Sequence, residues 1–376
     1  MNKENSEIFL HYPSSRDIVF VFGAGASHAD GVPLQRHMLP KILAGGNNEI
    51  AGSEIGKKVI KFLYENFSFN IDKNKFPRIE AVFGFLDYFI QQNESLNRNY
   101  SYSDIVQIKE YLIKLIHYIV DLRTDKPSKY YHRFWESVKL RNNNISIITL
   151  NYDTLLEQSF DFLFKKFGYI DYCTHLMNYE KSEKLKDFNF WINPREPIQF
   201  KGEDYPSPIK IIKIHGSLNW KYCNCCNQLL LTPWDRKIDL NKGKLLGYTY
   251  PDLEEYEYRC PLDGTDFQTL IMPPSHIKFL NHPIISHLLS EAAREVRATK
   301  KIVFVGYSLS DADVHIKALF KKSIQPDVKV TVVNARLPEN LRLKYSSLSN
   351  NIEFIEESFE EMVFDDALMQ KLLTTQ

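Results

Sequence analysis

The sequence has 376 residues, a length that fits one large domain with insertions or two modest domains. Lys plus Arg and Asp plus Glu both total 47, so the formal net charge is zero. Proteins that bind nucleic acid through its phosphates carry a basic excess, so we expect no direct nucleic-acid binding. Hydrophobic residues make up 44% and aromatic residues 13%, which is enough for a packed core and excludes a mainly disordered chain.

The first residues are polar, and no apolar run approaches the ~20 residues that a membrane helix needs. We therefore expect a soluble cytoplasmic protein without a signal peptide or a membrane span. The five cysteines, four of them in one region, exclude a disulfide scaffold.

Short runs rich in Val, Ile and Phe recur along the chain, a composition typical of strands that are covered on both faces of a sheet. The predicted strands are Ile18–Phe22, Ile145–Leu150, Ile209–Ile214, Ile302–Val305 and Val328–Val333, with a weaker sixth at Ile352–Ile355. Helical patterns cover Thr154–Phe167, which Gly168 would end, and Ile284–Ala298. The succession of strand, helix and strand predicts an α/β fold with a doubly wound, parallel, Rossmann-like sheet.

Two long segments interrupt this pattern. Residues 35–140 have mainly helical periodicity, with an apolar stripe formed by Ile105, Ile108, Leu112, Leu115, Ile116 and Ile119. Residues 172–274 are irregular, aromatic and interrupted by prolines, and they hold the cysteine group. We predict one nucleotide-binding domain over residues 1–335 that carries both insertions, followed by a last strand and a helical tail over residues 336–376.

The sharpest local signal is the turn after the first predicted strand, which reads Gly23, Ala24, Gly25, Ala26 and Ser27. Glycines allow a tight turn and a close approach to a ligand, and the N–H groups that follow can hold phosphate oxygens. The third glycine of the usual dinucleotide fingerprint is missing, so a tight turn without a ligand is the alternative.

Asn151 and Asp153 follow the second predicted strand. Ligands of open α/β sheets bind outside the carboxyl ends of the strands, where these side chains are expected. Asp153 alternatively caps the helix that begins near Thr154, and the two roles are compatible. Asn151 is not needed as a cap, and we interpret it as functional.

His215 ends the third predicted strand, next to Gly216 and at the same edge of the sheet. An imidazole can accept or donate a proton near neutral pH. A single His is otherwise most simply a structural residue.

Gly306, Tyr307 and Ser308 follow the fourth predicted strand, and Asn334 ends the fifth. We expect Gly306 and Ser308 to meet a ribose or phosphate group and Asn334 to meet an adenosine. The segment from Ser308 to Asp311 alternatively caps the helix that follows it.

Together, the four motifs resemble the sirtuin-like (SIR2-like) domain, in which such turns surround NAD. The resemblance spans about residues 18–334, and residues 78–83 also resemble a short helical signature of bacterial members. Residues 34–36 read Leu-Gln-Arg where protein deacylases carry Phe-Arg, and two prolines stand at 273 and 274 where deacylases add their peptide as a strand. The chain is thus more similar to the bacterial antiphage-defence SIR2 proteins, which hydrolyse NAD, than to the deacylases.

The resemblance implies NAD+ as the substrate and a role for each motif. The glycine turn with Ser27 would hold the pyrophosphate and the neighbouring ribose. Asn151 would orient the attacking water or the carboxamide, and His215 would bind a hydroxyl of the nicotinamide ribose. Asp153 would contact that ribose or hold the turn.

The implied activity is that of an NAD+ glycohydrolase, which releases nicotinamide and ADP-ribose and depletes NAD as the effector of an antiphage defence system. Family members of this kind work as homo-oligomers or beside a helicase-type ATPase, an Argonaute-like protein or a nucleotide sensor. The alternatives are a non-enzymatic module that binds NAD or an ADP-ribose derivative, and an NAD-dependent deacylase.

Cys223 and Cys226 are separated by two residues, a spacing at which two thiolates can share one metal ion. By the resemblance they stand in the place of the sirtuin zinc ribbon, with Cys260 as a third ligand and Asp263 where sirtuins usually have Cys. A structural zinc ion completed by Asp263 or Cys225 and a ribbon that has lost its metal both remain open.

Overall fold

The computed structural model describes residues 6–9, 12–43, 48–124, 126–164, 168–177, 191–193, 196, 198–200, 207–232, 237–248, 255–278 and 280–375. They form two compact units, each built from more than one stretch of the chain. The core unit draws on residues 1–30, 126–216 and 280–376, and the insertion unit on residues 31–125 and 217–279.

An eight-stranded sheet, counted over the described residues, forms the centre of the core unit, with the order β16-β15-β14-β2-β3-β7-β4-β5. All neighbouring strands run parallel. The strands are β2 (Arg16–Phe22), β3 (Ile145–Thr149), β4 (Gly168–Asp171), β5 (Trp191–Ile192), β7 (Ser207–Lys213), β14 (Thr299–Val305), β15 (Lys329–Val333) and β16 (Ile352–Ile355). From β2 the chain builds one side of the sheet and later returns to β14 on the other side, so the strand order reverses between β2 and β14.

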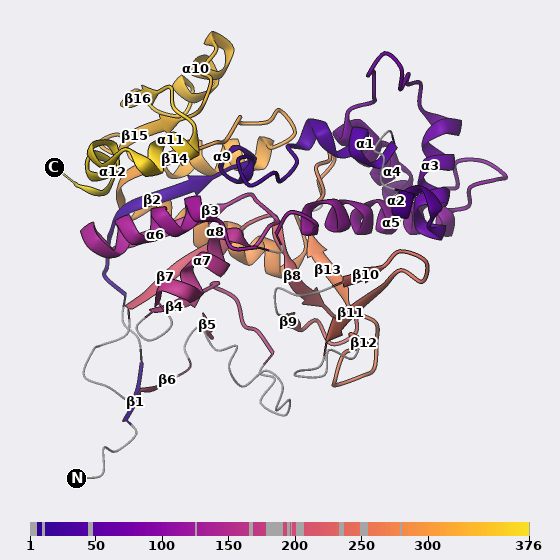
Figure 1. Ribbon diagram of the computed structural model, residues 1–376, viewed down its shortest axis with the longest axis horizontal. Helices are drawn as coiled ribbons and strands as arrows, with labels where there is room; N and C mark the ends of the chain where they lie inside the picture. The colour runs from indigo at the N-terminus through magenta and orange to yellow at the C-terminus, as the bar shows by residue number, and fades with distance from the viewer. Residues whose placement is uncertain are drawn as a thin grey trace. The chain divides into compact units, whose positions relative to one another are not determined.

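Helices cover both faces of this sheet (Figure 1). Phe134 packs edge-on against Phe20 and Phe22 of β2, with ring centroids 5.1 and 5.2 Å away. Phe304 of β14 packs instead against Phe320 of α9 (Val314–Ser323). Strand residues of alternating parity thus meet two different helix layers, which accounts for the continuous apolar runs in the sequence. The helices of the core unit are α6 (Lys129–Arg141), α7 (Leu155–Phe164), α8 (Pro283–Arg297), α9 (Val314–Ser323), α10 (Glu339–Ser346), α11 (Phe359–Phe364) and α12 (Asp366–Leu373).

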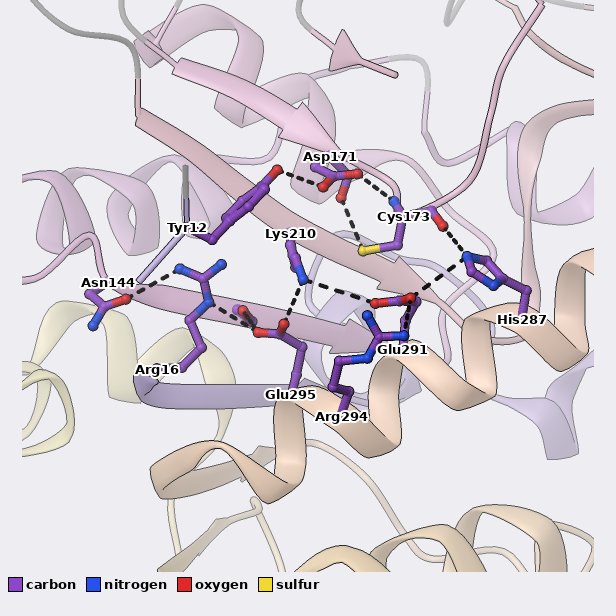
Figure 2. Close-up of polar contacts among 11 residues, drawn as sticks. Tyr12, Arg16, Asn144, Asp171, Cys173, Lys210, His287, Glu291, Arg294 and Glu295 are labelled. Carbon is purple, nitrogen blue, oxygen red and sulfur yellow. Dashed lines mark hydrogen bonds and ion pairs between the residues drawn. The ribbon is translucent and has the colours of Figure 1, made fainter. Parts of the chain in front are cut away.

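A buried network of charges joins α8 to three strands (Figure 2). The carboxylate of Glu295 accepts hydrogen bonds from Arg16 Nε at 3.0 Å, Lys210 Nζ at 2.7 Å and Ser146 Oγ at 2.5 Å. Burial alone would raise the pKa of Glu295, but the Lys210 and Arg16 charges hold it below its usual range. The network pairs these buried charges with one another and ties α8 to β2, β3 and β7.

Over its described residues, the insertion unit consists of helices and two small sheets. Its helices are α1 (Gln35–Leu43), α2 (Asn48–Gly52), α3 (Glu54–Asn66), α4 (Ile79–Gln92) and α5 (Tyr102–Asp121). The apolar stripe predicted for residues 105–119 is buried on α5, which begins at a capping box between Ser101 and Asp104. The sheets are β13 (Gln268–Ile271), β8 (Gly216–Tyr222) and β9 (Leu229–Leu231), and β10 (Lys237–Asp239), β11 (Lys244–Tyr248) and β12 (Glu255–Glu257).

The predicted doubly wound parallel sheet is confirmed, and all six predicted strands are present in it. The short strands β4 and β5 were not predicted, and β4 begins at Gly168, where the pattern places only the end of a helix. That helix is α7, which covers Leu155–Phe164, and residues 165–167 lie outside the described residues. A separate antiparallel pair, β1 (Ser6–Ile8) with β6 (Ile198–Phe200), also belongs to the core unit.

The two compact units differ from the predicted division of the chain. Helix α6 overlaps the end of the expected insertion 35–140 but belongs to the core unit, and Phe134 packs on the central strand β2. Strand β7 lies within the expected insertion 172–274 but pairs with β3 in the middle of the sheet. The observed insertion unit therefore ends before α6 and resumes only after β7.

Candidate functional site

The predicted motifs meet at one edge of the sheet because of the strand register. One row of paired residues crosses the sheet and consists of Lys213, Thr149, Phe22, Val305 and Val333. In parallel strands, the residues that follow such a row leave the sheet at the same edge. One or two positions beyond it stand His215, Asn151, Gly23, Gly306 and Asn334.

The two glycine turns meet where the strand order reverses, between β2 and β14. The N–H of Gly25, in the short 3₁₀ helix η1 (Ala24–Ser27), donates to the carbonyl of Gly306 at 2.8 Å. A Cβ on Gly23 would lie 2.6 Å from Cα of Tyr307, and one on Gly306 would lie 2.4 Å from N of Ala26. Gly306 also has φ of +62°, so both backbone space and conformation require glycine there.

The same contacts reduce the number of backbone N–H groups in the turn that are available to a phosphate. The N–H groups of Gly23, Gly25 and Ala26 donate to protein carbonyls at 3.0, 2.8 and 3.0 Å. These three amides are therefore not the ones that would hold a phosphate.

Asn151 links the glycine turn to β3. Its Nδ2 donates to the carbonyl of Gly23 at 3.0 Å and to Oγ of Ser27 at 3.1 Å. Ser27 is completely buried and shares a further hydrogen bond with the hydroxyl of Tyr131 at 3.0 Å. Because Nδ2 must be the donor to a carbonyl, the other amide atom is the acceptor Oδ1, which is buried and has no hydrogen-bond partner among the described residues.

Asp153 is buried in the same cluster and does cap the next helix, since it accepts a hydrogen bond from the N–H of Leu155 at 3.2 Å. Burial raises the pKa of Asp153, while the charge of Lys213 and a hydrogen bond with Ser27 act in the opposite direction. Lys213 is itself buried and donates to the Asp153 carbonyl at 2.6 Å and to Glu157 at 2.7 Å. A buried ion pair thus fixes the backbone of the turn that carries Asp153.

His215 is buried beside the loop that follows β14. Its Nε2 lies 3.8 Å from Oδ1 of Asp313, and its ring stacks on that of His315 with centroids 5.6 Å apart. Oδ2 of Asp313 accepts a hydrogen bond from the hydroxyl of Tyr307 at 3.1 Å. The structure therefore adds a carboxylate and a second imidazole to the predicted His.

The remaining predicted residues of this loop have different environments. The side chain of Tyr307 is buried, and its carbonyl accepts hydrogen bonds from Nδ2 of Asn334 at 3.1 Å and from Tyr345 at 2.8 Å. Ser308 is exposed. Helix α9 begins after the loop with Asp313 at its N-cap and without a side-chain capping bond, so the alternative role of this segment as a cap is wrong.

Asp30 follows the glycine turn and is held by the start of α6. It accepts a hydrogen bond from Oγ of Ser128 at 2.7 Å, and Ser128 also caps α6 by accepting from the N–H groups of Tyr130 and Tyr131. Burial, with a contribution from the nearby Asp153 carboxylate, raises the pKa of Asp30 to about 6.

The insertion unit brings together the predicted cysteine ligands. The sulfurs of Cys226 and Cys260 lie 3.6 Å apart, and Sγ of Cys223 lies 3.3 Å from Oδ2 of Asp263. These four donor atoms all lie within 4.8 Å of one another, while the exposed Cys225 is outside the set. Three thiols and one carboxylate at this spacing fit a tetrahedral zinc ion, with Asp263 in the fourth position.

Sequence reasoning missed Tyr131, Asp30, Asp313 and His315. Asp313 and His315 lie in or just after the Gly306 loop, so the motif itself pointed to their neighbourhood. Tyr131 forms a hydrogen bond with Ser27, which lies 104 positions away in the sequence, and no local sequence pattern predicts that contact.

The fold and this edge of the sheet define a Rossmann-like α/β protein with a buried polar site at its strand reversal. The chain belongs to the SIR2-like domain family, whose model matches residues 145–355, more than half of the sequence. No helix within the described ranges is long and apolar enough to cross a membrane.

Comparison with solved structures found similar chains among Sir2 proteins. A Sir2 homologue–NAD complex is 14% identical, with a TM-score of 0.45, over 96% of this chain and 91% of that chain. A mutant Sir2 homologue in complex with 2′-O-acetyl ADP ribose is 14% identical, with a TM-score of 0.46, over 95% and 92% of the two chains. A structure of Sir2Tm bound to a propionylated peptide is 12% identical, with a TM-score of 0.42, over 95% and 94%. Comparison with curated proteins gave no match.

Proposed function

We propose that this protein is an NAD+ glycohydrolase, in which water displaces nicotinamide from its ribose to give nicotinamide, ADP-ribose and a proton. Membership of the SIR2-like family supports NAD+ as the substrate. The buried polar cluster at the strand reversal supports a reaction there, since ligands of open α/β sheets bind at this position.

The observation that carries the proposal is the buried Oδ1 atom of Asn151, which has no hydrogen-bond partner among the described residues. A buried acceptor without a partner costs free energy, and such atoms in folded proteins commonly await a ligand or a water molecule. The donor end of the same amide is held by Gly23 and Ser27, so the acceptor has a fixed orientation.

The reaction requires the protein mainly to position the reacting groups and to stabilise the charge that develops. Nicotinamide departs from a cationic pyridinium, so positive charge develops on the ribose as the bond breaks. In our proposal Asn151 accepts a hydrogen bond from the attacking water, and the Asp153 carboxyl contacts the ribose from the turn fixed by Lys213. His215 binds a ribose hydroxyl and supplies acid–base help, which typically contributes ~10²–10⁴-fold to a rate.

The remaining motif residues would serve the rest of the dinucleotide. We assign the turn from Gly23 to Ser27, apart from the amides of Gly23, Gly25 and Ala26, and the exposed hydroxyl of Ser308 to the ribose and phosphate groups. Gly306, whose N–H donates to Val333 and whose carbonyl accepts from Gly25, would serve there by allowing the two turns to approach closely. Tyr307 and Asn334 hold the loop in place through their hydrogen bonds and would act on the substrate through it.

The cysteine cluster would hold a structural zinc ion in the insertion unit. Cys223, Cys226, Cys260 and Asp263 supply four protein ligands, which leaves no open position for a reaction. Its role in this proposal is stability of the insertion unit.

Hydrolysis is favoured over deacylation by the segment that would receive an acylated peptide. Strand β13 ends at Ile271, and Pro273 and Pro274 follow it outside any strand of the described residues. Prolines lack the N–H that strand addition requires. We further propose that the enzyme depletes NAD in an antiphage defence system, as a homo-oligomer or with a partner that triggers it.

The test is to incubate NAD+ with the protein, purified alone and from its native operon, and to separate the products by chromatography. We expect nicotinamide and ADP-ribose without any acyl peptide, and neither product with His215→Ala. Deacylated peptide formed together with nicotinamide would instead identify a deacylase. Tight NAD+ binding without turnover in every preparation would identify a binding module.

A further inference from the structure

His215, Asp313 and His315 form a cluster of metal-ligating side chains in the core unit. One ligand atom from each residue lies within 4.8 Å of the other two. The cluster brings together the end of β7 and the start of α9, since His215 follows β7, Asp313 precedes α9 and His315 lies in its first turn. This arrangement is separate from the cysteine cluster, which belongs to the insertion unit.

The separation between His215 and Asp313 suits a shared ion better than a direct hydrogen bond. Nε2 and Oδ1 lie 3.8 Å apart, beyond the roughly 2.7–3.2 Å of an N–H···O hydrogen bond. Ligand atoms at about 2.0–2.2 Å from one tetrahedral zinc ion are themselves roughly 3–4 Å apart. The gap therefore has the width that an ion between the two atoms requires.

The spacing of the two imidazole rings also suits a shared ion. Their ring planes differ by 29° and their centroids are 5.6 Å apart. Two imidazoles that bind one ion through bonds of about 2.0–2.1 Å place their ring centres roughly 5–6 Å apart. The observed spacing of the two rings is therefore compatible with one ion bound by a nitrogen of each ring.

A hydrogen bond from Tyr307 orients the Asp313 carboxylate as a metal ligand would need to be oriented. The buried hydroxyl of Tyr307 donates to Oδ2 at 3.1 Å, which leaves Oδ1 as the atom that faces His215. The carbonyl of Tyr307 is itself fixed by Asn334 and Tyr345. Outer hydrogen bonds of this kind orient the carboxylate ligands of metal ions in proteins.

We propose that His215, Asp313 and His315 bind a divalent transition-metal ion of the zinc class. Two imidazole nitrogens and one carboxylate oxygen are a donor set that zinc accepts, with one coordination position left for water. The ion occupies Nε2 of His215 and thereby inhibits NAD+ cleavage, a consequence that rests on the function proposed above. The binding itself does not depend on that function.

Binding is tested on the full chain with Co²⁺ as the probe. Cobalt bound to thiolates gives charge-transfer bands that a nitrogen and oxygen site lacks, so the two clusters are distinguished by their spectra. We expect the wild-type protein to bind one ion more at a thiolate-free site than His315→Phe, which keeps an aromatic ring against His215 but has no ligand atom. Loss of a ligand weakens affinity by about 100-fold or more, since outer-sphere changes alone cost 10–100-fold.

The matched control is His175→Ala, which removes an exposed histidine of the same unit and should leave Co²⁺ binding unchanged. Equal binding at the thiolate-free site by wild-type protein and His315→Phe would overturn the proposal. Asp313→Asn provides a second variant that changes no ring packing, and it too must weaken binding.

The inhibitory consequence is measured as NAD+ cleavage with and without added Zn²⁺. Zn²⁺ should inhibit the wild-type enzyme at least about 10-fold more strongly than His315→Phe. Equal inhibition of both proteins would overturn the inhibitory role. A protein that binds the ion but never cleaves NAD+ would contradict the proposed function and leave the metal site standing.

Discussion

Nδ2 of Asn151 lies 3.1 Å from Oγ of Ser27, and this hydrogen bond joins the residues that follow β3 to the turn that follows β2. This hydrogen bond also determines which atom of the Asn151 amide is available to a ligand. With its donor end used inside the protein, Asn151 keeps only its acceptor Oδ1 for a ligand. A side chain that both ties two strand ends together and presents one acceptor is suited to hold a water molecule in a fixed place.

Asn151→Ala should lower NAD+ cleavage by about 100-fold or more, the effect of removing one oriented polar group from an active site. Stability should fall by only about 1–2 kcal/mol, since the loss comprises two hydrogen bonds from one buried side chain. Initial rates of nicotinamide release and urea unfolding measure the two effects.

Asn144→Ala is the matched control, because Asn144 lies just before the other end of β3 and bonds to Arg16 and Ser15. It should lose some stability and keep full activity. Equal activity losses in the two variants would mean that Asn151 acts only through the fold.

Gly306→Ala should destabilise the core unit strongly. A Cβ there would lie 2.4 Å from N of Ala26, and φ is +62°. The left-handed conformation costs roughly 1–2 kcal/mol for a residue with a side chain, and the backbone clash adds about 1–3 kcal/mol. The midpoint of thermal unfolding measures the loss.

Gly264→Ala separates the two causes in that prediction. Gly264 has φ of +76°, but a Cβ added to it would have no neighbouring atom within 4 Å, so only the conformational cost applies. We expect its midpoint to fall clearly less than that of Gly306→Ala. Similar midpoints for the two variants would refute the claim that the glycine turns need close backbone approach.

Asp30 should make stability depend on pH in a defined direction. Its pKa is raised to about 6, so between about pH 4 and pH 6 the folded protein binds a proton that the unfolded chain has released. Stability therefore falls as the pH rises through this window, and the penalty is fully present above pH 6. Because Asp30 is only partly buried, we expect on the order of 1 kcal/mol.

Asp30→Asn should flatten this part of the pH profile, measured by urea unfolding from pH 4 to pH 7. The comparison is the difference between the two proteins at each pH, which cancels the titration of all other groups. A difference that is constant over this range would contradict the assigned pKa.

The sequence was informative about the sheet edge for a physical reason. Strand runs are continuous and apolar where a sheet is covered on both faces, so their ends are sharp, and Gly23, Asn151, His215 and Gly306 stand just beyond those ends. The ends of buried strands thus indicate the candidate site before any contact is known.

Contacts between residues that are far apart in the sequence could not be predicted in this way, because no local pattern indicates them. Tyr131 reaches Ser27 from a helix whose pattern resembles that of the insertion helices before it, and only packing on β2 assigns that helix to the core unit. Likewise, β4 is four residues long and gains its place by pairing with β7, a non-local interaction that short apolar runs do not reveal.

Cys226→Ser should remove a zinc ligand, whereas Cys225→Ser should not, although the two residues are neighbours. Cys226 lies 3.6 Å from Cys260 within the four-residue cluster, and Cys225 is exposed and outside it. Because metal binding contributes directly to folding free energy, Cys226→Ser should lower the thermal midpoint of the insertion unit by at least about 5 °C.

Cys225→Ser should match the wild-type protein in midpoint and in zinc content, measured by elemental analysis. A chelator should reproduce the effect of Cys226→Ser on the wild-type protein and add little to that variant. If the two serine variants retained the same amount of zinc, the cluster of Cys223, Cys226, Cys260 and Asp263 would not be the ligand set.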